Sequence, residues 1–265
     1  FGAPAPPARA PEQPPGRHGG SLAVPARCAV AVLLSPYHPG MKSELSNPQT
    51  LNDRMAELIR QKIVHGEFTP GQRLSEAALS ESLEISRNTL REVFRLLTKE
   101  GLLKHEPNRG VFVAIPSIAS IIDIYRVRRL IECQALAQAY PRHPAKKHLR
   151  DAVEMALRCR DAGDWQGVGT ANMEFHMAIV ELADSERLNV MFSHLLAELR
   201  LAFGLLNDPE FLHLPYVEMN VNILELFEAG KLQEAAAALN EYLVHSERIV
   251  LAVYARRISD SGTPK

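Results

Sequence analysis

One stretch of the chain, from Leu74 to Val113, constrains the possible folds more than any other. It begins with a short amphipathic segment over Glu76–Leu83, passes through a turn at Glu84–Ile85 and enters a longer segment of helical period. In that second segment the apolar side chains recur at helical spacing, at Leu90, Val93, Phe94 and Leu97. Two helices joined by so short a turn predict a helix-turn-helix unit.

Polar side chains gather at the N-terminal end of the second helix. Ser86 occupies the position of an N-cap, and the residues after it can hydrogen-bond to base edges or phosphates while the apolar stripe faces away. A recognition helix in the major groove presents its N-terminal end to the bases. The sequence therefore predicts DNA contacts from Ser86, Arg87, Asn88, Thr89 and Arg91.

A β-hairpin is predicted directly after this helix. Gly101 ends the helix, and two extended runs, Leu102–Leu103 and Val111–Val113, flank a polar turn. A helix pair with a hairpin can be a purely structural unit, but a hairpin at this place is typical of a DNA-binding wing. We expect its turn to reach the DNA backbone or the minor groove through Asn108, Arg109 and Gly110.

The same stretch resembles the winged-helix domain of GntR-type bacterial transcription regulators. The resemblance covers the whole predicted domain without a gap, and its most specific run is ISRNTLREVFRLLTKEGLL. An upstream helix over Thr50–His65, with Leu51, Met55, Leu58, Ile59 and Ile63 on one face, also fits the family, as does the pattern formed by Ile63, Gly66, Phe68, Pro70, Gly71 and Leu74. The chain departs from the family at Ala77, where many relatives carry an arginine.

Composition bounds the rest of the chain. With 265 residues, of which 46% are hydrophobic, it can bury a core in more than one domain. The formal net charge is −1, so basic residues must act locally on DNA. The three cysteines form no paired framework, and no apolar run approaches the ~20 residues of a membrane span. These features predict a cytoplasmic protein without membrane contact.

Four segments follow from the pattern along the chain, and the predicted fold class is mainly α. Residues 1–44 are rich in Pro and Ala and are expected to be disordered, with Met41 as the candidate natural start. The winged helix-turn-helix occupies 45–115, an antiparallel helical bundle 116–258, and a disordered tail 259–265. Six helical periods predict the bundle: Ile118–Tyr140, Lys146–Ala162, Trp165–Ala183, Arg187–Leu206, Pro209–Ala229 and Leu232–Arg256.

The bundle resembles the FCD effector domain that accompanies many GntR regulators, in its six-helix, VanR-like form. The resembling runs are YRVRRLIECQALAQAY, NMEFHMAIVELADSERL and ILELFEAGKLQEAAAALNEYL. Many members hold a divalent metal with an acid and three histidines, and the matching positions here are Asn172, His176, Asn220 and Tyr242. Neutral amides and a phenol are poor ligands for first-row metals, so we expect no metal and no cofactor.

The polar cluster that replaces the metal site is predicted to bind a small organic acid. Arg128 is the expected charged partner, beside Asn172, His176, Asn220 and Tyr242. The alternative is a cluster that satisfies itself through mutual and water-mediated hydrogen bonds.

Together these features predict a homodimeric transcription regulator on a pseudo-palindromic double-stranded operator. Repression relieved by a small carboxylate metabolite is the favoured arrangement. An architectural DNA-binding protein without an effector is the first alternative. An enzyme acting on the bundle ligand is the second, although the chain carries no recognisable catalytic motif.

Overall fold

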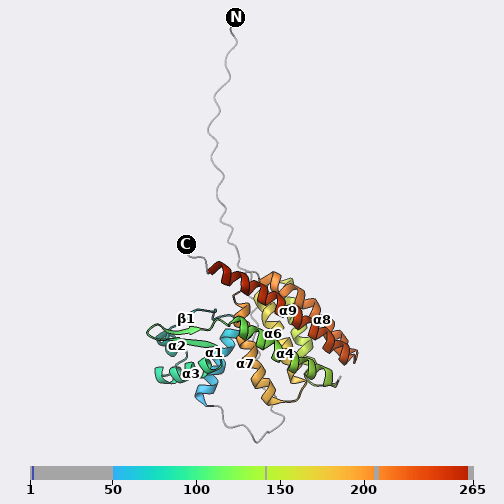
Figure 1. The fold of residues 1–265 in the computed structure, drawn as a ribbon, viewed down its shortest axis with the longest axis horizontal. Helices are drawn as coiled ribbons and strands as arrows, with labels where there is room; N and C mark the ends of the chain where they lie inside the picture. Colours follow the sequence, from blue (N-terminus) through green and yellow to red (C-terminus); the bar gives the residue numbers. More distant parts are fainter. Residues whose placement is uncertain (1, 3–49, 141, 206–208, 262–265) are drawn as a thin grey trace. The chain divides into compact units, whose positions relative to one another are not determined.

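A computed structural model describes residue 2 and residues 50–140, 142–205 and 209–261 (Figure 1). The disorder predicted for residues 1–44 therefore lies outside the described residues, apart from Gly2, as does the end of the predicted tail, 262–265. Every described residue from 50 onward belongs to one compact unit, which spans 38–265.

The N-terminal part of this unit is a winged helix. Its sheet is antiparallel with the strand order β1-β3-β2, and Leu103 lies opposite Val113 while Leu74 lies opposite Val111. The elements are α1 (Leu51–Val64), β1 (Arg73–Leu74), α2 (Glu76–Ser82), α3 (Arg87–Lys99), β2 (Leu103–Glu106) and β3 (Gly110–Val113). The helix-turn-helix and the wing are thus confirmed. Strand β1 was not predicted, because its two residues are extended only through their pairing with β3.

Local signals in the sequence explain where these helices begin and end. Thr50 forms a capping box with Asp53 at the start of α1, and Ser86 caps α3 by accepting a hydrogen bond from the backbone N–H of Thr89 at 3.1 Å. Glu84 in the turn and Gly101 after α3 both have positive φ. The chain can reverse at these points without breaking the helices on either side.

The core of the winged helix corrects one prediction. Leu90, Val93, Phe94 and Leu97 are buried, as their spacing predicts. In α1, however, Leu51 and Leu58 are exposed, and the buried stripe runs through Ala56, Ile59, Arg60 and Ile63. Arg60 can be buried on this face because Glu100 accepts its hydrogen bonds at 2.8 to 3.2 Å. The buried face is therefore rotated from the one that apolarity alone indicates.

Among the described residues after the wing, six helices form the C-terminal bundle, as predicted. They are α4 (Ile118–Gln138), α5 (Lys146–Asp161), α6 (Trp165–Glu181), α7 (Glu186–Phe203), α8 (Pro209–Glu228) and α9 (Leu232–Ser261). Helix α6 contacts α4, α5, α7 and α8, and most of its residues are buried, which suits its largely apolar sequence. Helix α9 continues to Ser261, past the boundary predicted at residue 258.

Helix α7 joins the bundle to the winged helix. Its residues Ala197 and Leu201 belong to the same buried cluster as Ile59, Ile63 and Leu97 of the DNA-binding part, and Figure 1 shows α7 beside α1. Because packed interfaces transmit displacements of their elements, a shift of α7 would also displace the elements of the winged helix that pack against it. No helix among the described residues is long and apolar enough to cross a membrane.

Candidate DNA-binding surface and effector site

The N-terminal end of α3 presents two side chains that its cap leaves unused. The hydroxyl groups of Ser86 and Thr89 lie 2.9 Å apart and are engaged in capping the helix. Arg87 and Asn88 are exposed beside them. Among the predicted contacts at this end, Arg87 and Asn88 are therefore the side chains best placed to reach a base edge.

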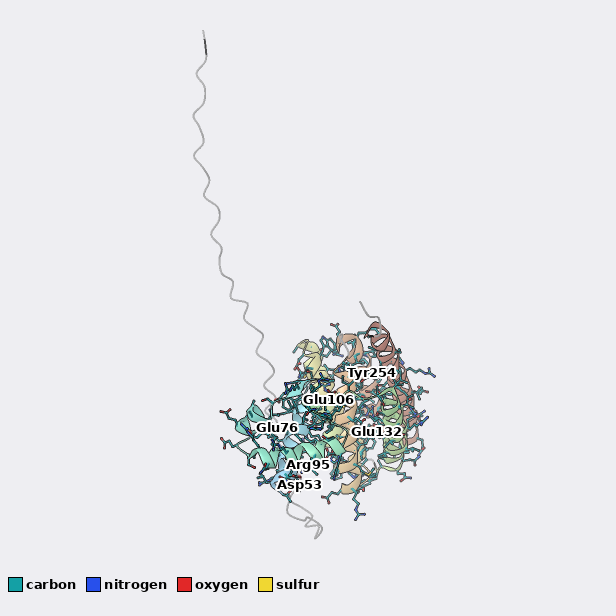
Figure 2. The ribbon with its side chains drawn as sticks, turned by 60° about the vertical axis from the view of Figure 1, so that its left-hand side comes forward. Asp53, Glu76, Arg95, Glu106, Glu132 and Tyr254 are labelled. Atoms are coloured by element: carbon teal, nitrogen blue, oxygen red, sulfur yellow. The ribbon has the colours of Figure 1, made fainter. Side chains whose placement is uncertain are left out.

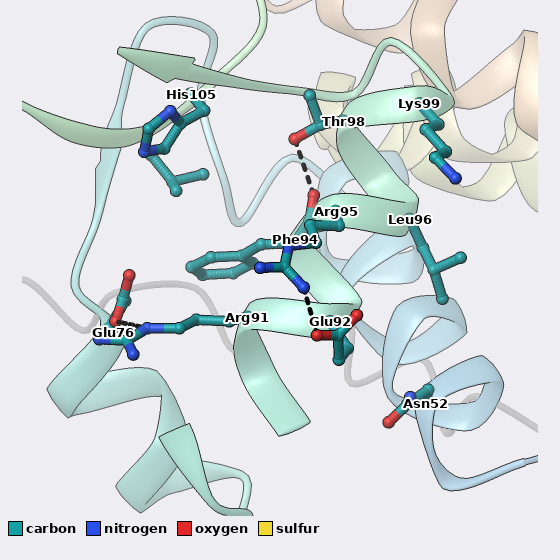
Figure 3. A pocket seen from close by; sticks show the side chains of 11 residues that line it. Asn52, Glu76, Arg91, Glu92, Phe94, Arg95, Leu96, Thr98, Lys99 and His105 are labelled. Atoms are coloured by element: carbon teal, nitrogen blue, oxygen red, sulfur yellow. Dashed lines mark hydrogen bonds and ion pairs between the residues drawn. The ribbon is translucent and has the colours of Figure 1, made fainter. Parts of the chain in front are cut away.

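A row of basic side chains lies along one face of α3. Its members follow one another at intervals of four residues and are all exposed: Arg87, Arg91, Arg95 and Lys99. Figure 3 shows Arg91 directed toward Glu76 of α2 and Arg95 toward Glu92, while His105 of β2 lies across the hollow. The Nε atom of Arg91 lies 3.0 Å from Glu76. Such exposed pairs are weak, so a phosphate or a base can displace the carboxylate.

This row of basic side chains borders a hollow of about 620 Å³ between α3 and the sheet. In Figure 2, Glu76 and Arg95 lie on the winged helix, together with Glu106 of the wing. At the tip of the wing, Arg109 is exposed and donates to Glu106 at 2.5 Å, and its guanidinium lies 5.5 Å from the centre of the Phe112 ring. Asn108 and Gly110 both have positive φ, which turns the chain tightly around Arg109.

Inside the bundle, the four residues that resemblance places in one site do come together. Asn172 Oδ1 accepts hydrogen bonds from Asn220 Nδ2 at 2.8 Å and from the Tyr242 hydroxyl at 3.0 Å. The ring of His176 meets that of Tyr242 with centroids 5.0 Å apart. Helices α6, α8 and α9 thus contribute to one buried polar cluster, which we call the bundle cluster.

A buried charged triad adjoins the bundle cluster and contains Glu132, which was not among the predicted site residues. Glu132 Oε1 accepts from Arg128 Nε at 2.6 Å, and Glu132 Oε2 lies 2.6 Å from His176 Nδ1. Figure 2 labels Glu132 in the bundle. The spacing of four residues between Arg128 and Glu132 signals their pairing, but only tertiary structure brings His176 to them.

The protonation states of the triad follow from burial and charge. Burial opposes ionisation of Glu132, but Arg128 and His176 together outweigh it and hold the pKa of this carboxyl below its usual value. Burial lowers the pKa of His176 more than Glu132 raises it, so the imidazole is neutral at pH 7. Arg128 is therefore neutralised by Glu132 before any ligand arrives.

Three atoms around the triad and the bundle cluster have unused hydrogen-bonding capacity. Arg128 Nη2, His176 Nε2 and Asn220 Oδ1 are buried and have no hydrogen-bond partner among the described residues. Buried polar atoms in proteins are almost always paired with protein groups or water. The protein's own groups therefore satisfy this region only in part.

The donor set around His176 does not fit a transition metal. No group of three or more His, Cys, Asp or Glu side chains among the described residues is placed to hold one. Glu132, the nearest carboxylate, already accepts from Arg128 and contacts His176. The remaining groups are amides and a phenol, which are weak ligands for such ions. The absence of a metal stays a prediction.

Comparison with known proteins agrees with both parts of the chain. Residues 51–113 match the family model "Bacterial regulatory proteins, gntR family", and residues 123–245 match the model "FCD domain". A solved structure from Rhodococcus sp. RHA1, described as a GntR transcriptional regulator, is 35% identical; the match covers 77% of this chain and 98% of that one, with a TM-score of 0.72. The chain belongs to the GntR family.

Curated GntR-type relatives are regulators. The HTH-type transcriptional regulator YdhC of Bacillus subtilis is 27% identical over 51% of this chain, and the HTH-type transcriptional repressor RspR of Escherichia coli is 32% identical over 37% of it. The chain spans 62% and 43% of these two relatives. E. coli McbR/YncC, at 21% identity and a TM-score of 0.67, shares the fold. The expectation that the chain is no enzyme agrees with this family of transcription regulators.

Proposed function

We propose that the protein is a homodimeric, ligand-responsive DNA-binding transcription regulator. The observation that carries the proposal is the exposed N-terminal end of α3, with Arg87 and Asn88 uncommitted and Arg109 at the tip of a wing on the same unit. An exposed polar helix end beside a wing fits a recognition helix in the major groove with a wing along the backbone.

A dimer would place two such helices on successive faces of a pseudo-palindromic operator, about 34 Å apart if the half-sites are one turn apart. Leu130 on α4 is a candidate contact residue, because it is 72% exposed on the outward face of the helix, between the exposed residues Arg126 and Gln134. We assign the dimer contact to this face of α4.

The bundle is proposed to hold a small carboxylate that also carries hydroxyl groups. Arg128 Nη2 can only donate, so it calls for a ligand acceptor such as a carboxylate oxygen. His176 donates through Nδ1 to Glu132, which leaves Nε2 as an acceptor, and Asn220 Oδ1 is a second acceptor. One acidic group and two donors match a hydroxycarboxylate better than a plain carboxylate.

Ligand binding is proposed to release the operator, which makes the protein a repressor. The ligand would reposition α6 and α8, and α7 would transmit the change to α1 through their shared core. A coupling of about 1–3 kcal/mol, typical of allostery, changes operator affinity by roughly 5- to 150-fold.

The DNA half of the proposal is tested by selecting binding sites from random duplexes with the purified chain and measuring affinity by fluorescence anisotropy. Arg91→Ala should weaken specific binding by about 1–3 kcal/mol and relax preference at one position if Arg91 reads a base. Arg158→Ala, an exposed arginine of α5, is the matched control and should change nothing. Binding that ignores sequence and falls steeply with salt would instead favour an architectural protein.

The effector half is tested by a thermal-shift screen of hydroxycarboxylates and plain carboxylates, followed by operator release with each hit. A ligand bound only by the folded state raises the melting temperature. Tyr242→Phe and Asn220→Leu should reduce that rise, because they remove groups of the bundle cluster. Stabilisation that both variants retain would place the ligand elsewhere.

A further inference from the structure

A second cavity, which we call the junction cavity, lies where the winged helix meets the bundle. Its volume is about 190 Å³. The loop after α1 and the helices α6, α7 and α8 all contribute to its wall, which includes Phe68, Pro70, Trp165, Gln166, Arg200 and His213. Gln166 is exposed, and its side-chain Nε2 donates a hydrogen bond to the backbone oxygen of His65. The side chain of Gln166 therefore links bundle and winged helix at this point.

The junction cavity holds a positive charge that the described residues do not balance. Arg200 is only 8% exposed, and no described carboxylate lies within ion-pair distance of its guanidinium. Burial lowers the pKa of Arg200 to about 10, so it remains charged at neutral pH. Buried charges in proteins are normally paired, because their desolvation is expensive. This arginine stands out from the other buried arginines, Arg60 and Arg128, which both meet a glutamate.

His213 also lines the junction cavity and has an unused ring nitrogen. It is 4% exposed, and its Nδ1 is buried without a hydrogen-bond partner among the described residues. Burial and the nearby charge of Arg200 lower the pKa of His213 to about 3, so the ring is neutral. In the tautomer with the proton on Nδ1, a neutral imidazole donates a hydrogen bond from that atom. The described residues therefore leave hydrogen-bonding capacity unused at both Arg200 and His213, which line the same cavity.

A glycine of α6 makes room for the side chains of Arg200 and His213. A Cβ atom added at Gly169 would overlap Arg200 Nη1 and lie 2.8 Å from His213 Nε2. Glycine inside a helix is unfavourable relative to alanine, and Gly169 has no positive φ that would require it. The close approach of Arg200 and His213 to α6 accounts for this residue.

From these features we infer that the junction cavity is an oxyanion site for a small carboxylate or phosphate, separate from the bundle cluster. The anion would accept from the guanidinium of Arg200 and from Nδ1–H of His213. A volume of about 190 Å³ is below the usual 300–1,000 Å³ of drug-sized sites and holds about six waters at ~30 Å³ each, which suits inorganic phosphate or a short carboxylic acid.

The same two helices connect the junction cavity to the bundle cluster. Gly169, Asn172 and His176 follow one another at spacings of three and four residues on α6, as do His213, Tyr216 and Asn220 on α8. Such residues share one helix face, so the two sites are neighbours along α6 and α8. An anion at the junction also lies beside the loop after α1. Any effect of the bound anion on DNA affinity rests on the proposed function, whereas the binding of the anion to the junction cavity does not.

Trp165 gives a direct readout, because it lines the junction cavity and is the only tryptophan of the chain. The full-length protein is titrated with inorganic phosphate and, separately, with succinate, at constant ionic strength and with chloride as the reference. We expect a saturable change in tryptophan emission and a higher melting temperature with at least one of the two anions. The anion whose titration saturates shows whether the site prefers a phosphate or a carboxylate.

Arg200→Met should weaken that binding by about tenfold or more, since it removes a charge-assisted hydrogen bond to the anion. It should also raise the melting temperature without anion, because it removes a buried unpaired charge. His213→Phe is a second variant with an intact Arg200 and should bind the anion more weakly. Arg158→Met on the surface is the control that should respond like the parent protein.

A change in emission that is linear with every salt and equal in all variants would overturn the inference. So would an Arg200→Met variant that melts lower and still binds the anion, because Arg200 would then only pack. This experiment contains no DNA, so a negative result would not contradict the proposed regulatory function. Failure of the operator selection would likewise not contradict the anion site.

Discussion

The Glu132→Gln substitution should destabilise the protein far more than its small change in shape implies. Glu132 is fully buried, accepts from Arg128 Nε at 2.6 Å and lies 2.6 Å from His176 Nδ1. Glutamine keeps the volume but removes the negative charge, which leaves Arg128 charged and uncompensated in the interior. Breaking a buried pair in this way costs about 3–5 kcal/mol.

In a domain of this size, a loss of 1 kcal/mol lowers the melting temperature by about 2–4 °C, so we expect a decrease of roughly 6–20 °C. Urea denaturation followed by circular dichroism gives the free energy of unfolding directly. Asp151→Asn is the matched control: its exposed pair with Lys147 should contribute at most about 1 kcal/mol.

The double variant Arg128→Met with Glu132→Leu separates charge from packing. Replacing both members of a buried pair by apolar residues is often neutral or stabilising, so the double variant should recover more than half of the loss. A loss below about 1 kcal/mol for Glu132→Gln would refute the argument that Glu132 compensates Arg128. A double variant at least as unstable as the single one would refute it equally.

Three further predictions concern stability and assembly. Gly101→Ala should lower the free energy of unfolding by roughly 1–2 kcal/mol because φ is +76° there, although the added Cβ would lie an uncrowded 3.6 Å from Glu198; an unchanged urea midpoint would contradict this. The folded-state pKa of His213 is depressed to about 3, so its contribution is present above the unfolded pKa of about 6.5 and is lost as pH falls below it. Stability should thus drop by about 2 kcal/mol from this group between pH 7 and pH 5, and His213→Leu should flatten that part of the urea profile. Leu130→Asp should convert dimers to monomers in light scattering, and a persistent dimer would move the contact away from this face of α4.

Much of the fold follows from local sequence. The caps at Thr50 and Ser86, the turn after α3 and the period of Leu90, Val93, Phe94 and Leu97 depend on residues within a few positions of one another. The six bundle helices follow from the same kind of signal. The strand β1 and the exposure of Leu51 and Leu58 do not, because both depend on which distant element packs against the segment.

The candidate sites divide in the same way. Sequence spacing named the exposed end of α3 and the pair Asn172 and His176, whereas Asn220 and Tyr242 were named only through the family resemblance. It did not show that Glu132 takes the charge of Arg128 and contacts His176, 44 positions along the chain. Nor did it single out Arg200 and His213, whose meeting at Gly169 needs three helices in contact.

By itself, then, the sequence determined where most helices start and stop, which of their residues recur at apolar spacing, and that a helix-turn-helix with a wing precedes a helical bundle. The tertiary structure alone decided which buried charges are balanced and which are not. The reason is physical: helix formation and capping act over one or two turns of chain, whereas the free energy of a buried charge depends on every group that surrounds it in space.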